Sequence, residues 1–145
     1  MRQKEKKSKA QVFLERVEMI DTIIENKLIE QRQWKDLALS ITANMGGERV
    51  QSSGTQSKMA NAIEKCVDIE SEINCLIDEL IDTKKKVIEV LEKLYSPMEY
   101  KILHMRYIQC ISLSNIAEQL NKEYTWVTTT HGRALKNVQN ILEKQ

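Results

Sequence analysis

Two long stretches carry apolar residues at steps of three and four, and this spacing constrains the fold most. The first runs from about residue 9 to 43, and the second from about 57 to 95. Such steps place apolar side chains on one face of an α-helix. Because an apolar stripe must be buried, we expect the two helices to pack together. The first stripe is Phe13, Val17, Ile20, Ile24, Leu28, Trp34, Leu37 and Ile41, and the second is Met59, Ile63, Cys66, Ile69, Ile73, Leu76, Leu80, Val87, Leu91 and Leu94.

The interval between the stretches, at about residues 44–56, ends the first helix. It contains three of the four glycines and two serines, which favour turns over helix. It lacks the Gly-Lys-Ser/Thr ending of a phosphate-binding P-loop. We therefore interpret it as the loop of a long antiparallel helical hairpin, a coiled coil that occupies residues 1–95.

A second domain is expected at residues 96–145. Ser96 can cap a helix, Pro97 suits its first turn, and Glu99 completes a capping box. After a break come a short helix, a tight turn at Asn121 and a third helix. The turn needs a positive φ, which Asn tolerates better than most residues. The expected core of the last two helices is Ile116, Ala117, Leu120, Val127, Thr130, Ala134, Leu135 and Val138.

Three short motifs in this C-terminal part carry a family resemblance. They are the Arg106-Tyr107 pair, the Leu-x-x-Ile-Ala core at Leu113–Ala117 and the Arg133-Ala134-Leu135 triplet. From residue 99 to about 142 the chain resembles region 4 of sigma-70-type RNA polymerase sigma factors. With the run from His131 to Leu135 following a long hairpin in sequence, the chain is similar to small phage and prophage proteins of Gram-positive bacteria that have a C-terminus like sigma region 4. The resemblance implies a helix-turn-helix domain that binds double-stranded DNA and contacts RNA polymerase.

The third helix departs from the sigma-factor pattern, because it offers Tyr and Thr where sigma factors usually offer Arg, Glu and Gln. In a helix-turn-helix, the N-terminal residues of this helix meet base edges in the major groove. Thr hydroxyls can donate or accept hydrogen bonds, and Thr methyls pack against the thymine methyl. We expect Tyr124, Thr125, Thr128 and Thr129 to contact bases, and Lys122, Arg133 and Lys136 to contact phosphates.

Several residues leave alternatives open. Trp126 either stacks on sugar-phosphate or covers the edge of the core, and we favour the core edge. Gly132 costs about 1 kcal/mol relative to Ala inside a helix, so it indicates close approach of another backbone or is tolerated without purpose. His131 is expected to be a partly exposed helix residue, and His104 lies among core-like neighbours.

The net charge of +1 is distributed unevenly along the chain. Residues 57–95 carry six basic and nine acidic groups, whereas residues 96–145 carry six and four. The second domain is thus only mildly basic, which predicts weak DNA binding by a monomer and favours a homo-oligomer. The basic residues within residues 1–9 form either an arm along phosphate or a solvated terminus.

The residues favour no enzyme, since no triad, metal motif or paired carboxylates in a loop are visible. We expect no catalytic, metal or cofactor site. The three cysteines without a secretion signal suit reduced, buried thiols in the cytoplasm, and no stretch approaches the roughly 18 apolar residues of a membrane span. The expected function is transcription regulation by DNA binding. The alternatives are a DNA-recognition subunit of phage packaging machinery and an interaction protein that docks on RNA polymerase without reading DNA.

Overall fold

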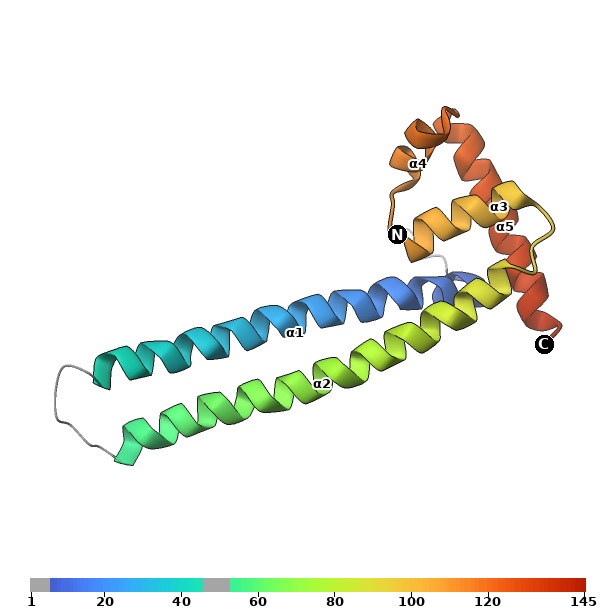
Figure 1. Ribbon diagram of the computed structural model, residues 1–145. Helices are drawn as coiled ribbons and strands as arrows, with labels where there is room; N and C mark the ends of the chain where they lie inside the picture. Colours follow the sequence, from blue (N-terminus) through green and yellow to red (C-terminus); the bar gives the residue numbers. More distant parts are fainter. Residues whose placement is uncertain (1–5, 46–52) are drawn as a thin grey trace. The chain divides into compact units, whose positions relative to one another are not determined.

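The computed structural model describes residues 6–45 and 53–145, in which all regular secondary structure is helical. This confirms the expected all-α class. The N-terminal residues 1–5 of the expected basic arm, and residues 46–52 of the expected Gly/Ser-rich loop, lie outside the described residues. Figure 1 shows the order of the elements. They are α1 (Lys9–Met45), α2 (Ser53–Leu91), α3 (Pro97–Leu103), the π-helical turn η1 (His104–Ile108), α4 (Leu113–Leu120) and α5 (Tyr124–Glu143).

Contacts divide the chain into two compact units. The first consists of the described residues of Met1–Met19 together with Leu80–Gln145, and the second of those of Ile20–Glu79. Both long helices therefore contribute to both units. The beginning of α1 and the end of α2 belong with the short C-terminal helices, so the units do not follow the expected division after residue 95.

In the unit Ile20–Glu79, α1 and α2 lie side by side in opposite directions (Figure 1). Gln31 Nε2 donates a hydrogen bond of 3.2 Å to the carbonyl oxygen of Cys66. Lys27 forms an ion pair with Glu72, farther along α2. The partner of Lys27 comes later on α2 than the partner of Gln31, so α1 and α2 are antiparallel and these two contacts define their register.

Part of the predicted apolar stripe lies outside the seam between these helices. Lys27 and Gln31 are partly buried, whereas the apolar Leu28 between them is exposed. Likewise, the small Ala62 is buried beside the exposed Ile63. The seam of a coiled pair repeats every 3.5 residues whatever residue type occupies it, and a purely apolar stripe therefore misses its polar members. The members of the predicted stripe that are exposed are Leu28, Leu37 and Ile63.

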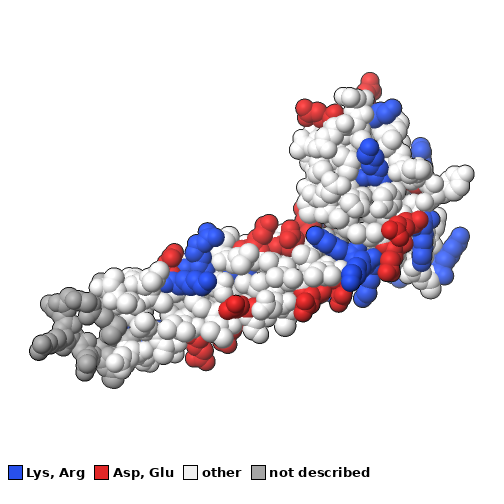
Figure 2. All heavy atoms as spheres, viewed as in Figure 1, with Lys and Arg blue, Asp and Glu red and all other residues white. Residues whose placement is uncertain are grey.

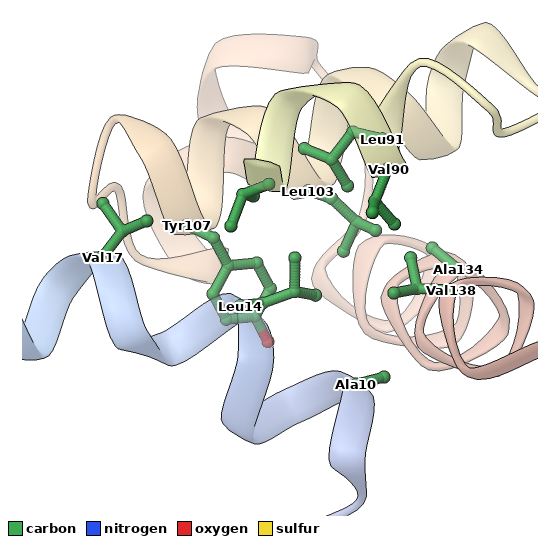
Figure 3. Packing of buried hydrophobic residues seen from close by; sticks show 10 residues of the cluster. Ala10, Leu14, Val17, Val90, Leu91, Leu103, Tyr107, Ala134 and Val138 are labelled. Atoms are coloured by element: carbon green, nitrogen blue, oxygen red, sulfur yellow. The ribbon is translucent and has the colours of Figure 1, made fainter. Parts of the chain in front are cut away.

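The main core of the first unit joins residues from both ends of the chain (Figure 3). Leu14 of α1 and Leu91 of α2 are fully buried with Leu103 of α3. The backbone N–H of Ala10 also donates a hydrogen bond of 2.9 Å to the Gln139 side chain. The beginning of α1 and the end of α2 thus supply six of the ten buried residues of the core that holds α5. The remaining buried members are Val17, Val87, Val90, Tyr107, Ala134 and Val138.

Helix α2 stops earlier than its apolar stripe predicts, at Leu91 rather than near Tyr95. The N–H groups of Lys93 and Leu94 bond to carbonyls three residues back, which tightens the helix end into a turn. Tyr95 is fully exposed there. A new helix then starts at Pro97, as the sequence predicts.

The expected capping box at this start is only half formed. Ser96 Oγ accepts a hydrogen bond of 3.4 Å from the backbone N–H of Glu99. The Glu99 carboxylate does not reach back to the cap. It is 5% exposed and accepts a hydrogen bond of 2.9 Å from Asn137 Nδ2, which ties α3 to α5. A buried carboxylate requires such a partner, since an unpaired one would be costly.

The three cysteines are free thiols. Cys66 is half-buried in the seam, but Cys75 and Cys110 are exposed, so the expectation that all three are buried is wrong for these two. Cys110 adopts a φ of 58° just after η1, where the chain turns towards α4. Among the described residues, no helix combines the length and apolar character that crossing a membrane requires.

Candidate nucleic-acid interface

A second cluster of buried residues holds α4 against α5 within the first unit. Ile116 and Ala117 of α4 pack with Val127 of α5 and with Ile102 of α3. Asn121 ends α4 with φ 53° and ψ 43°, the left-handed conformation expected for this turn. Its short side chain tolerates that conformation, so the chain can reverse within three residues and begin α5 at Tyr124.

Helix α5 separates its core face from an outer face. Residues advance by about 100° along an α-helix, so positions four apart share a side. Val127, Ala134 and Val138 are fully buried, and Thr130 is 6% exposed. The opposite side carries the residues expected to contact DNA. Of these, Tyr124, Thr125, Thr129, Arg133 and Lys136 are exposed, Thr128 is half-buried, and Lys122 is exposed in the preceding turn.

The hydroxyl groups of two threonines on this face are already engaged. Thr128 Oγ1 donates a hydrogen bond of 3.0 Å to the carbonyl oxygen of Thr125, and Thr129 Oγ1 donates one of 2.8 Å to the same oxygen. Each hydroxyl has a single hydrogen, so it can only accept from a further partner. The sequence predicts that these hydroxyls donate or accept hydrogen bonds, but in this conformation they are available to DNA only as acceptors.

The aromatic residues at the start of α5 lie at the surface. Tyr124 is 56% exposed and Trp126 is 38% exposed. Trp126 belongs to neither buried cluster but is more than half covered, so its expected place at the core edge stays a prediction. Lys122 Nζ lies 5.1 Å from the centre of the Trp126 ring, a cation–π contact that holds this charge beside the helix start.

The two basic residues farther along α5 are free to meet a ligand. Arg133 and Lys136 are exposed, and neither forms an ion pair or hydrogen bond with the described part of the chain. Arg133 therefore does not anchor the core. Both cations can bind a phosphate without first breaking an internal contact.

Gly132 lies on the same outer face, between Thr129 and Lys136. A Cβ atom built at Gly132 would meet no atom within 4 Å. No described backbone of this chain approaches it, so close approach within the protein is not the reason for this glycine. The missing side chain leaves a shallow spot in the middle of the outer face.

His131 does not belong to this face. Its Nε2 lies 2.8 Å from the hydroxyl of Tyr107, and the two rings stack with centres 5.7 Å apart. Burial, followed by the nearby Arg106 charge, lowers the pKa of His131 below its usual 6.5. Burial raises the pKa of Tyr107 to about 12. The neutral imidazole and the neutral phenol therefore share a hydrogen bond, which links η1 to α5.

Sequence reasoning missed the pairing of Tyr107 with His131. The available signal was that Tyr107 lies in a motif of the sigma-factor resemblance and His131 in the run similar to phage and prophage proteins. Arg106 extends this contact, since its guanidinium carbon lies 5.4 Å from the Tyr107 ring centre and Nη1 lies 3.5 Å from Glu18 Oε2. The set fastens α1, η1 and α5 together behind the candidate interface.

The second histidine lines an open depression on α3 and η1. Gln109 Nε2 donates a hydrogen bond of 2.9 Å to His104 Nδ1. The depression has a volume of about 510 Å³, and its lining is mainly apolar. Its other lining residues are Pro97, Tyr100, Lys101 and Met105.

Charge around the interface is mixed rather than strongly basic. Figure 2 shows Lys and Arg interspersed with Asp and Glu over the visible face. Glu123 is exposed directly before α5, where its negative charge interacts favourably with the helix dipole but would repel a phosphate. Few phosphate contacts are therefore available. Comparisons of the chain with models of protein families, with curated proteins and with solved structures find no match.

Proposed function

We propose that this protein binds double-stranded DNA through the outer face of α5 and regulates transcription, in a phage or prophage setting. In this proposal α4, the Asn121 turn and α5 form a helix-turn-helix like that of sigma region 4, behind a long helical hairpin. One observation carries the proposal: α5 presents Thr125, Thr129 and Lys136 outward, directly opposite its buried residues.

The outer face divides into two roles. Tyr124, Thr125, Thr128 and Thr129 lie near the helix start, where recognition helices reach base edges. Because Thr128 and Thr129 offer acceptor oxygens and methyl groups, they suit the amino groups of adenine and cytosine and the methyl of thymine. They do not suit guanine, which presents only acceptors in the major groove.

The basic residues supply affinity rather than sequence preference. Arg133 and Lys136 follow about one and two turns after Thr129, the last residue of the reading face, and Lys122 precedes that face. Each phosphate contact releases counterions and steepens the salt dependence of binding by about one unit. Three such contacts predict weak binding with a salt slope of about three units, in agreement with the mixed charge of the surface.

The test uses the full chain, because residues 9–19 and 80–91 contribute to the core that holds α5. Duplexes that bind are selected from a random pool, and their affinity is then measured at several salt concentrations. Arg133→Ala and Lys136→Ala should weaken binding to every duplex and reduce the salt slope by about one unit each. Lys65→Ala makes the same charge change on the unit Ile20–Glu79 and serves as the matched control.

Two results would contradict the proposal. The first is no measurable binding to any duplex at low salt by the folded protein. The second is an equal loss of affinity for Lys65→Ala and Lys136→Ala, which would indicate attraction by net charge alone. Including phage promoter fragments and packaging-site fragments in the assay separates a regulator from a DNA-recognition subunit of packaging machinery.

A second candidate function is docking on RNA polymerase without reading DNA. The observation that favours it is the apolar depression on α3 and η1, where Tyr100 and Met105 line an accessible volume. Lys101→Glu would reverse an exposed charge at this depression without changing a residue of the core that holds α5. Polymerase binding that is lost in this variant, together with absent DNA binding by the unchanged protein, would favour docking.

A further inference from the structure

The unit Ile20–Glu79 exposes large apolar side chains along one flank of its helical pair. Leu39 is 68% exposed and Val67 is 58% exposed, although both lie on well-ordered helices. Single exposed apolar residues need no explanation, but several on one side of a helical pair indicate an interaction site. The other exposed members on this flank are Leu28, Ile63 and Ile77.

Both helices contribute to the same flank. Lys35 and Leu39 of α1, together with Ile63 and Val67 of α2, line a shallow groove of about 370 Å³. Steps of three and four extend each row along its helix on that side. We name this surface the flank face. It consists of Asp21, Glu25, Leu28, Arg32, Lys35 and Leu39 on α1 and of Ile63, Val67, Glu70, Asn74 and Ile77 on α2.

Charge changes sign along the α1 row of the flank face. Asp21 and Glu25 come before Leu28, and Arg32 and Lys35 follow it. None of these four charged side chains forms an ion pair with a described residue of the chain. The row is therefore an acidic half and a basic half of equal length on either side of one leucine.

We propose that the flank face binds a second copy of this chain in antiparallel orientation, with a twofold axis near Leu28. The row of α1 then lies against the same row of the second copy. Asp21 and Lys35 each lie seven residues from Leu28, so the axis places them opposite each other. Glu25 and Arg32 lie three and four residues from Leu28, which brings Glu25 close to Arg32 of the other copy. Such an isologous contact repeats each pair twice, and each charge meets the opposite sign.

The α2 row fits the same axis. Gln31 lies opposite Cys66, so Ile63 is near the level of Lys35 and Ile77 is near the level of Asp21. The antiparallel arrangement therefore places Ile63 of one copy against Ile77 of the other. Val67 meets the neutral Asn74, while the two Glu70 side chains approach each other at the axis and oppose the association.

A parallel arrangement lacks this complementarity. It would place α1 of one copy against α2 of the other at the same level. Asp21 and Glu25 would then face Ile77 and Asn74, which carry no charge to pair. In size, residues 21–35, which lie opposite each other about this axis, span about 21 Å at 1.5 Å per residue, and two helices are about 20 Å wide. Two copies would bury on the order of 800 Å² in total, the size of a weak interface whose occupancy depends on protein concentration.

The first test measures the oligomeric state of the full chain by sedimentation over a range of micromolar concentrations. The expected result is a concentration-dependent dimer. Leu28→Asp and Val67→Asp should shift the protein to monomer, because each buries a charge at the flank face near the twofold axis. Leu37→Asp is the matched control, since Leu37 is 47% exposed but lies on the other flank of α1. A monomer at every concentration, or equal dissociation by Leu37→Asp, would overturn the proposal.

The second test exchanges charges within the α1 row. Glu25→Arg alone, or Arg32→Glu alone, places like charges opposite each other at two symmetric positions and should weaken the dimer roughly tenfold. The double variant restores opposite charges and should regain the original dissociation constant. A double variant as weak as the product of the single variants would show that residues 25 and 32 do not face each other. Circular dichroism melts confirm that every variant is folded.

Discussion

Replacing Thr128 and Thr129 with Ala should strongly reduce sequence preference without unfolding the protein. Both side chains lie on the outer face of α5 and belong to neither core cluster. Ala is a better helix former than Thr by roughly 0.5 kcal/mol per residue. The double variant should therefore melt no lower than the unchanged protein. Any loss of binding then reflects the interface rather than the fold.

The expected magnitude follows from the contacts that each threonine can make. A base contact contributes roughly 1–3 kcal/mol to discrimination, so losing two should reduce the preference for the selected duplex by at least about thirtyfold. The assay compares dissociation constants for the selected and a random duplex at one salt concentration. Binding to the random duplex should change little, since it depends on Arg133 and Lys136.

The variant Thr128→Val/Thr129→Val divides the effect into its parts. Val keeps a branched apolar side chain and removes the acceptor oxygen. Retained preference would assign the reading to methyl contacts with thymine, and lost preference would assign it to acceptance from amino groups. If the Ala pair changes neither preference nor affinity while the melting curve is intact, the assignment of α5 to the major groove is wrong.

Three further outcomes test the structure around this face. Gly132→Ala should raise stability by about 1 kcal/mol in thermal melts, since the added Cβ meets no atom within 4 Å, and a loss of stability would contradict the open space. Asn121→Val should lower the free energy of unfolding by about 1–2 kcal/mol, because a β-branched residue opposes the positive φ, whereas Asn121→Gly should not. Equal effects of the two variants would contradict the left-handed conformation at this turn. Because the pKa of His131 is lowered in the folded chain, the unfolded chain binds a proton more readily. This contribution to stability should be present above pH 6.5 and lost as pH falls through the lowered pKa of the folded state. Thermal melts of His131→Phe should lack this pH dependence.

Features written locally in the sequence were predicted correctly. Helix α1 begins at Lys9, α3 begins at Pro97 behind the Ser96 cap, and Asn121 adopts the left-handed turn. Each depends on a few consecutive residues whose backbone preferences are strong. The buried positions of α5 followed from helical periodicity alone, since its core and outer faces are well separated.

Features that join distant segments were not predicted. Glu99 looked like half of a capping box, but its carboxylate bonds to Asn137 on another helix. Lys27 and Gln31 occupy the seam despite their polarity, because Glu72 and the carbonyl of Cys66 satisfy them. In each case the partner is at least 35 residues away in sequence, so no local pattern carries the information. For the same reason, the composition change near residue 96 did not reveal that the core extends into α1.

The four threonines of α5 show why orientation, rather than composition, decides which residues can read DNA. Thr130 donates a hydrogen bond of 2.8 Å to the carbonyl of Trp126, the same local bond that Thr129 makes to Thr125. Yet Thr130 is 6% exposed and fills the core side, whereas Thr129 is exposed. One step of about 100° along the helix separates a residue that stabilises the fold from one available to a partner. Substitutions at Thr130 should therefore change melting temperature, and those at Thr129 should change binding.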